Sequence, residues 1–250
     1  MQIHGLNKTT LLDYPEHVAA TVFTGGCNFC CPFCHNKDLV LNPSAVPLIA
    51  EEEVLAFLKK RIGILSGVCI TGGEPTLQKD LSEFIRKIKD LGYLVKLDTN
   101  GSRPKVLKSL LEEGLLDYVA MDVKNSPEKY GMTIGKMVGT AGREDDSGIK
   151  DDTGIKDSCT DMVSESIRLI IESGVAHEFR TTVVRELHKE EDIARIAEWI
   201  KGADAYFLQA YRDNENVIRK GFSAYGKAEM EKMAEIAGKY VSRVEIRGLE

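Results

Sequence analysis

Residues 23–36 read FTGGCNFCCPFCHN, and four of the six cysteines in the 250-residue chain lie within eight positions of this stretch. Cys27, Cys31 and Cys34 form a C-x3-C-x2-C pattern directly after an apolar run. Three thiolates on a short loop suit an iron–sulfur cluster, although most cubane clusters take four cysteine ligands. A cluster held by three cysteines leaves one iron open, and an open metal position distinguishes a catalytic site from a structural one. The stretch therefore predicts a catalytic [4Fe-4S] cluster.

Cys30 allows other patterns, namely C-x2-C-x3-C through Cys27, Cys30 and Cys34, or two adjoining C-x2-C pairs. Structural zinc sites separate two such pairs by a dozen or more residues, whereas here the separation is zero. A redox C-x2-C pair is expected beside a thioredoxin-like unit, and disulfides are disfavoured in a chain without a secretory signal. The residues alone favour a cluster over zinc or a disulfide and leave both cysteine triplets open.

The overall composition indicates one globular domain over residues 1–250. The chain is 43% hydrophobic and 29% charged, which is ordinary for a domain of this length. Its net charge of −6 opposes binding to nucleic acid, because phosphate contacts need clustered Lys and Arg. The first residues lack a basic segment before an apolar core, and no apolar run approaches the roughly 20 residues that span a bilayer. We therefore expect a cytoplasmic protein without nucleic-acid or membrane partners.

Segments with strand character alternate with segments of helical periodicity along most of the chain. The predicted strands are 18–23, 68–71, 93–97, 118–121, 178–184, 205–208 and 244–246, preceded by a hairpin or strand within 3–15. The predicted helices are 51–62, 79–91, one from 104, one after 161, 190–200 and 226–238. This alternation predicts an α/β fold with a parallel sheet, and about six units suit an incomplete parallel (β/α)6 barrel.

The alternation breaks at about residues 136–159. Residues 145–150 and 151–156 form a tandem hexapeptide, DDSGIK followed by DDTGIK. This acidic repeat lacks the ligand spacing and the closing Glu of an EF-hand calcium loop, and it offers little apolar surface to bury. We predict a mobile surface insertion here.

Polar motifs follow three of the predicted strands at their carboxyl ends, where parallel α/β barrels gather their working residues. Adjacent glycines let the backbone approach a ligand closely, and a carboxylate beside them can accept hydrogen bonds from an amino group. Aspartates that end neighbouring strands are expected to converge, either as an acid/base pair or as ligands to a cation. The motifs are Gly72-Gly73-Glu74-Pro75, Asp98-Thr99-Asn100 and Asp122-Val123-Lys124.

Three further residues are candidates for the same site. Arg180 lies within a predicted strand, so its charge needs a partner, which is either a ligand carboxylate or an Asp or Glu of the chain. Gln209 follows the next strand and is expected at the rim. Phe33 precedes Cys34 in a Pro-Phe turn, where it either stacks on an aromatic ligand or simply packs. The plain alternative for the charged motifs is an ion pair between Asp98 and Lys124.

With these motifs the chain resembles the radical S-adenosylmethionine (radical SAM) enzymes, whose signature is the C-x3-C-x2-C spacing followed by a Gly-Gly-Glu motif. Residues 5–15 (GLNKTTLLDYP) and 179–184 (FRTTVV) make it similar to the glycyl-radical enzyme activating proteins. It is most similar to those that activate anaerobic ribonucleoside-triphosphate reductase. The resemblance covers nearly the whole chain and departs from the family at Cys30 and at the insertion.

The resemblance implies the cofactors and their contacts. Cys27, Cys31 and Cys34 are the implied ligands of a [4Fe-4S] cluster with Cys30 as a bystander thiol, and SAM binds the open iron. The Gly-Gly-Glu motif is implied to hold the methionine amino group, Phe33 to stack on the adenine, and the two aspartates to hold a monovalent cation near SAM. The implied SAM contacts are Phe33, Gly72, Gly73, Glu74, Pro75, Asp98, Thr99, Asn100, Asp122, Lys124, Arg180 and Gln209.

The resemblance also implies the reaction. The cluster and SAM generate a 5′-deoxyadenosyl radical, which installs a glycyl radical in a partner enzyme, while flavodoxin or ferredoxin supplies the electron. No side chain is implied as an acid or a base. The alternatives are a radical SAM enzyme that acts on a small molecule, a partner of the pyruvate formate-lyase type, and an electron-transfer or cluster-carrier protein without catalysis.

Overall fold

The computed structural model describes residues 1–135 and 154–249. The strands of this part form one sheet in which they follow one another in sequence order. β1 is antiparallel to β2, and every later pair of neighbours is parallel. The strands are β1 (Ile3–Thr10), β2 (Ala19–Thr24), β3 (Gly67–Gly72), β4 (Leu94–Thr99), β5 (Tyr118–Asp122), β6 (Ala176–Val183), β7 (Tyr206–Ala210) and β8 (Val244–Arg247).

The predicted α/β fold with an incomplete parallel barrel is confirmed. Strands β2 to β7 are each followed by helical structure, which makes the six expected β/α units, and β8 adds a further parallel strand. The segment predicted as a hairpin or strand is a single strand, β1, that pairs with β2. The strand order begins at β1 and ends at β8, so the sheet of the described residues is not closed.

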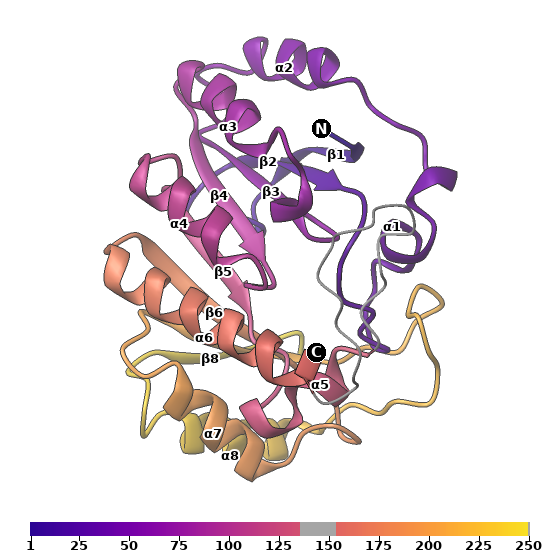
Figure 1. Ribbon diagram of the computed structural model, residues 1–250, viewed down its shortest axis with the longest axis vertical. Helices are drawn as coiled ribbons and strands as arrows, with labels where there is room; N and C mark the ends of the chain where they lie inside the picture. The colour runs from indigo at the N-terminus through magenta and orange to yellow at the C-terminus, as the bar shows by residue number, and fades with distance from the viewer. Residues whose placement is uncertain (136–153, 250) are drawn as a thin grey trace.

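Helices cover the outside of the sheet and follow one another along an arc from α2 at the top to α7 and α8 at the bottom (Figure 1). The longer helices are α2 (Glu51–Lys59), α3 (Leu81–Asp90), α4 (Pro104–Glu112), α6 (Gly154–Ser173), α7 (Glu190–Trp199) and α8 (Lys227–Ala237). Shorter helices and 3-10 turns are α1 (Lys37–Leu41), α5 (Tyr130–Thr133), η1 (Pro43–Ala45), η2 (Pro75–Leu77) and η3 (Pro127–Lys129).

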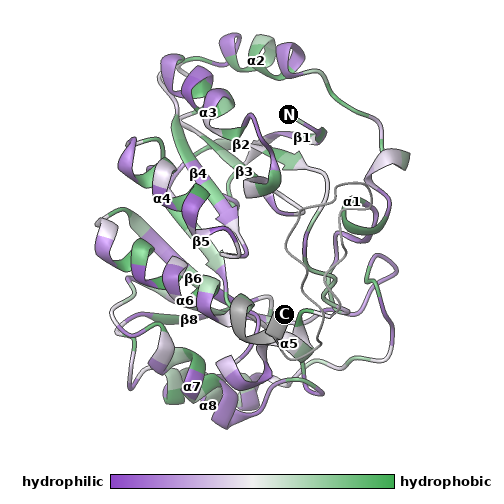
Figure 2. Ribbon diagram, in the orientation of Figure 1, coloured by the Kyte–Doolittle hydropathy of each residue, from purple (hydrophilic) through white to green (hydrophobic). Residues whose placement is uncertain are grey.

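Helix α3 illustrates why these segments are helical. Leu81, Phe84, Ile85 and Ile88 recur at the spacing of one helix face, and all four are buried in the core. Polar residues occupy the remaining positions, so the helix carries both colours in Figure 2. Burial of this stripe against the sheet stabilises the helix more than its intrinsic propensity does.

Most predicted boundaries lie within two residues of those in the structure, and two differ by more. Helix α6 begins at Gly154, so residues 154–159 of the predicted insertion are helical, and residues 136–153 lie outside the described residues. Helix α2 ends at Lys59 rather than at Ile62, whose side chain is exposed. Every helix in the described ranges is too short or too polar to cross a membrane.

Candidate functional site

A cavity of about 260 Å³ lies at the carboxyl ends of β3 to β7, against the cysteine loop that follows β2. The structure brings all the predicted site residues to its wall except Glu74 and Pro75. Those in the wall are Cys27, Cys31, Phe33, Cys34, Gly72, Gly73, Asp98, Thr99, Asn100, Asp122, Lys124, Arg180 and Gln209.

The wall also contains residues that the sequence did not single out for a ligand. These are Phe29, His35, Asn36, Val40, Thr71 and Thr182. Asn36 joins two loops, because its side-chain amide donates to the Gly72 carbonyl over 2.8 Å and its backbone N–H lies 3.4 Å from the Cys34 sulfur. Its position two residues after the last cysteine of the motif is the signal that points to it.

Three of the four clustered cysteines face the cavity, and Cys30 does not. The backbone N–H of Cys30 instead donates to the Ile134 carbonyl over 3.0 Å. Within residues 1–135 and 154–249, no group of three Cys, His, Asp or Glu side chains is placed to hold a single metal ion. A cubane cluster distributes its thiolate ligands over different irons, so they need not converge on one point. The donor set therefore fits a multi-iron cluster bound by Cys27, Cys31 and Cys34.

The three thiols lie in a poorly solvated environment. Burial raises the pKa of Cys27 to about 12, and the nearby Glu74 acts in the same direction. Burial also raises the pKa of Cys31 and Cys34, while the positive charge of Lys124 opposes it. These groups are protonated thiols at neutral pH until a metal displaces the proton, because the thiolate is the form that ligates.

The paired glycines allow two loops of the chain to touch. A Cβ on Gly72, whose φ is +124°, would lie 2.3 Å from the Thr24 carbonyl oxygen, and one on Gly73 would lie 2.0 Å from the Gly26 oxygen. The Gly73 and Glu74 amides donate to these same two carbonyls over 2.9 and 2.8 Å. The backbone at the two glycines therefore lies close to the start of the cysteine loop, which is a part of the chain and not a ligand. Both glycines also face the cavity.

The role of Glu74 as an acceptor for a ligand amino group stays a prediction, and the structure shows which groups of the chain its carboxylate contacts. The side chain is fully buried, and it accepts from the backbone N–H and hydroxyl of Thr76, the hydroxyl of Thr99 and the backbone N–H of Asn100. Three of these donors, from Thr76 and Thr99, reach Oε1, and the Asn100 amide reaches Oε2. Burial raises the pKa of Glu74, and the same donors oppose the rise. Glu74 thus fixes the end of β4, and Pro75 is buried at the start of η2.

Asp98 and Asp122 converge as predicted, on the guanidinium of Arg180. Arg180 Nε lies 2.9 Å from Asp122 Oδ1, and its Nη1 lies 3.2 Å from Asp98 Oδ2. Lys124 Nζ is 2.9 Å from the second oxygen of Asp122, and Lys96 pairs with Asp98. The alternative ion pair between Asp98 and Lys124 is therefore wrong, and the partners of Arg180 are carboxylates of the chain. A monovalent cation between the two aspartates stays a prediction.

This network holds two negative and two positive charges at the cavity wall. Burial acts to raise the pKa of Asp122, but Arg180 and Lys124 outweigh it and lower that pKa to about 2. Arg180 and Lys96 likewise overcome burial and lower the pKa of Asp98. Burial disfavours the ammonium of Lys124, yet Asp122 raises its pKa. All of these groups are charged at neutral pH, and together they suit a ligand with both signs of charge.

His188 supports this wall from behind. Its Nε2 lies 2.8 Å from the Lys124 carbonyl oxygen, and its Nδ1 accepts from the backbone N–H of Val184 over 3.0 Å. Burial lowers the pKa of His188, so the imidazole is neutral, and the two contacts assign its proton to Nε2. His188 also lies near the ring of Phe33, with 6.5 Å between the ring centroids.

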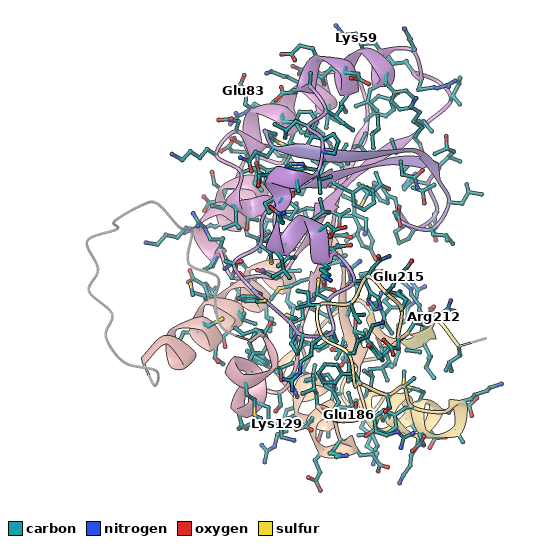
Figure 3. The ribbon with its side chains drawn as sticks, turned by 90° about the vertical axis from the view of Figure 1, so that its right-hand side faces the viewer. Lys59, Glu83, Lys129, Glu186, Arg212 and Glu215 are labelled. Carbon is teal, nitrogen blue, oxygen red and sulfur yellow. The ribbon has the colours of Figure 1, made fainter. Side chains whose placement is uncertain are left out.

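The loop at 211–226, between β7 and α8, covers the outer side of the cysteine loop. The Ile218 and Arg219 amides donate to the carbonyls of Cys34 and Pro32 over 3.2 and 2.8 Å. The Arg212 carbonyl oxygen lies 2.7 Å from His35 Nε2. Figure 3 shows Arg212 and Glu215 on this loop, in front of the strands. The loop thereby limits the movement of the last part of the cysteine motif.

Comparisons with known proteins identify the family of the chain. Residues 21–200 match the Radical SAM superfamily. A protein of Methanocaldococcus jannaschii, named "Putative glycyl-radical enzyme activating enzyme MJ1227", is 34% identical over 248 residues, which is 98% of this chain and 95% of its own length. A 7-carboxy-7-deazaguanine synthase of Thermococcus kodakarensis is 29% identical over 179 residues, which is 71% of this chain and 59% of its own.

Solved structures share the fold at low sequence identity. Streptococcus suis SuiB bound to S-adenosylmethionine has a TM-score of 0.65 at 14% identity, and the match covers 89% of this chain and 48% of SuiB. Native anSMEcpe with bound AdoMet and Cp18Cys peptide has a TM-score of 0.58 at 15% identity, covering 91% of this chain and 62% of that one. The family match, together with the relative that aligns over almost its whole length, shows that this chain belongs to the Radical SAM superfamily.

Proposed function

We propose that this chain is an activating enzyme that cleaves SAM reductively and installs a glycyl radical in a partner protein, the anaerobic ribonucleotide reductase. Membership of the superfamily implies a [4Fe-4S] cluster and SAM. The M. jannaschii relative, similar along almost its whole length, bears the name of a putative glycyl-radical enzyme activating enzyme. The observation that carries the site assignment is the one cavity wall that joins Cys27, Cys31 and Cys34 to the network around Arg180.

In this proposal the chain binds and orients, and it excludes water from the reaction. Cys27, Cys31 and Cys34 would hold the cluster, which would supply one electron from flavodoxin or ferredoxin for the cleavage of SAM to methionine and the 5′-deoxyadenosyl radical that removes a hydrogen atom from a glycine Cα. Lys124 and Arg180 supply positive charge for the SAM carboxylate, while Asp98 and Asp122 supply negative charge for its cationic groups. Phe33 and Gln209 lie at the wall as contacts for the adenosine.

The ligand assignment is tested with two neighbouring cysteines. We expect Cys31→Ser to lose the cluster, measured as iron and sulfide content after anaerobic reconstitution. Cys30→Ser is the matched control, because Cys30 is outside the cavity wall, and it is expected to retain the cluster. The reverse pattern would overturn the assignment of Cys27, Cys31 and Cys34.

The activity is tested with reduced protein, SAM and anaerobic ribonucleotide reductase under argon. The expected result is a glycyl doublet in electron paramagnetic resonance spectra, together with 5′-deoxyadenosine and methionine. A reductase whose radical glycine is replaced by alanine is the control and should give no doublet. If a partner of the pyruvate formate-lyase type gives the doublet instead, the activase assignment stands and the choice of partner is wrong.

The second candidate is radical SAM chemistry on a small molecule, favoured by the similarity to 7-carboxy-7-deazaguanine synthase. Substrate-dependent formation of 5′-deoxyadenosine with purine-like compounds, and no radical on any protein partner, would select this candidate. Reduced, cluster-loaded protein that forms no 5′-deoxyadenosine with any of them would instead identify a cluster carrier.

A further inference from the structure

We propose that Asn100 is a positioning residue for the iron–sulfur cluster: its side-chain amide donates to the Cys27 sulfur and thereby raises the reduction potential of the cluster. Glu74 holds Asn100 in place for this role. The inference rests on the proposed function only in taking Cys27 as a cluster ligand.

The amide of Asn100 has a fixed orientation. Its Oδ1 accepts from the backbone N–H of Ser102 over 2.9 Å, and a backbone N–H can only donate. The NH2 group therefore points the other way, where it lies 3.0 Å from Asn28 Oδ1 and 3.8 Å from Cys27 Sγ. Asn100 is 5% exposed, so water competes little for these donors. The network itself thus assigns a donor rather than an acceptor to the sulfur.

Asn100 is held by contacts on both sides. The Glu74 carboxylate accepts from the Asn100 backbone N–H over 2.7 Å. Asn28, the partner of the amide, is itself fixed because its own NH2 donates to the Ser102 hydroxyl over 2.8 Å. Residues from the loops after β2, β3 and β4 therefore form one connected path from Glu74 through Asn100 to Cys27. This path gives the buried carboxylate of Glu74 a function without direct ligand contact.

A hydrogen bond to a ligating sulfur stabilises the more negative, reduced state of a cluster and raises its potential. Backbone amides of Phe29 and Asn36 also approach the sulfurs of Cys27 and Cys34, each at 3.4 Å. Substitution leaves those backbone donors in place. The contribution of Asn100 comes from a side chain, so substitution can remove it.

The test is a redox titration of the reconstituted cluster, followed by electron paramagnetic resonance in the absence of SAM and partner. We expect Asn100→Ala to keep its iron and sulfide and to shift the midpoint potential to more negative values. Asn100→Asp, which keeps the acceptor for Ser102 and replaces the donor with a negative charge, should shift it further in the same direction. Glu74→Gln should also lower the potential. The NH2 group of the glutamine cannot accept the hydrogen bonds that the carboxylate accepts, so Asn100 would be held less firmly.

Asn36→Ala is the matched control, because its side-chain amide lies in the same cavity wall and donates to a carbonyl rather than to sulfur. The potential of this variant is expected to stay at the wild-type value. An unchanged potential in both Asn100 variants, or an equal shift in Asn36→Ala, would overturn the inference. Iron retained by Cys27→Ser would instead refute the ligand assignment, so the two failures are distinguishable.

Discussion

The two faces of the central strands are stabilised in different ways. In β4, Val95 and Leu97 are fully buried in the apolar core, whereas the alternate residues Lys96 and Asp98 face the other side of the sheet as an ion pair. In β6, Phe179 lies in the core and its neighbour Arg180 joins the charged network. The outer face is held by the removal of apolar area from water, and the inner face by the pairing of buried charges.

This difference has a consequence for how each face tolerates change. An apolar side chain that is shortened loses its own contacts and leaves a cavity, and the cost does not depend on pH. A charge that is removed from the inner face leaves its partners with less compensation, so the cost depends on whether those partners can take up a proton. Substitutions on the two faces of the same strands therefore distinguish stabilisation by apolar burial from stabilisation by charge pairing.

The largest effect is expected from Arg180→Leu. The variant leaves both Asp98 and Asp122 without the guanidinium that lies between them, and we expect the free energy of unfolding at pH 7 to fall by about 3–5 kcal/mol. Urea denaturation followed by circular dichroism measures it. Arg168→Leu is the control, since Arg168 pairs with Glu172 at the exposed surface, and it should leave the midpoint unchanged.

The pH dependence identifies the cause of this loss. In the wild type the lowered pKa of Asp122, about 2, means that its ion pairs stabilise the fold above about pH 4 and lose this effect as the pH falls toward 2. In Arg180→Leu the two partly buried aspartates take up protons at a higher pH than in the wild type, and protonation reduces the loss of stability in the variant. The difference in the free energy of unfolding between the wild type and the variant should therefore be smaller at pH 4 than at pH 7. An equal difference at both pH values would mean that the loss comes from packing.

A smaller effect is expected from Leu97→Ala, on the outer face of β4. The substitution should lower the free energy of unfolding by about 3 kcal/mol, through lost burial and the cavity that remains. The same urea titrations at pH 7 and pH 4 should give equal losses, since no charge is uncovered. A loss that changed with pH would contradict the distinction between the two faces.

The sequence predicts the outer face better than the inner one. The period of Leu81, Phe84, Ile85 and Ile88 identifies α3 because burial on one helix face requires that spacing. The cysteine spacing and the strand-end motifs locate the cavity for a similar reason, since parallel strands end at one edge. The pairing of Asp98 with Arg180 could not be predicted in this way. The two residues are 82 positions apart in the sequence, and only the register of the sheet brings them together. The same holds for Glu74, whose four donors come from two separate turns.

The smallest of these effects is expected from His188→Gln, which tests the support of the charged wall. Loss of the imidazole contacts to Lys124 and Val184 should lower the free energy of unfolding by about 1 kcal/mol at pH 7.5. Because burial lowers the pKa of His188 below its usual value near 6.5, the unfolded chain binds more protons, and the contribution of His188 falls as the pH drops through 6.5. Urea titrations between pH 7.5 and pH 5.5 should show the difference in the free energy of unfolding between the wild type and His188→Gln becoming smaller. A difference that grows as the pH falls would mean that the imidazole is charged in the folded protein.

The contact between the paired glycines and the cysteine loop provides a direct reporter of metal loading. The amide protons of Gly73 and Glu74 point at the carbonyls of Thr24 and Gly26, so solvent deuterium can replace them only when the two loops separate. A bound cluster ties the cysteine loop down and should slow this replacement, while the amides of distant surface turns keep their rates. Two backbone protons that point away from the cysteine sulfurs thus record whether those sulfurs hold a cluster.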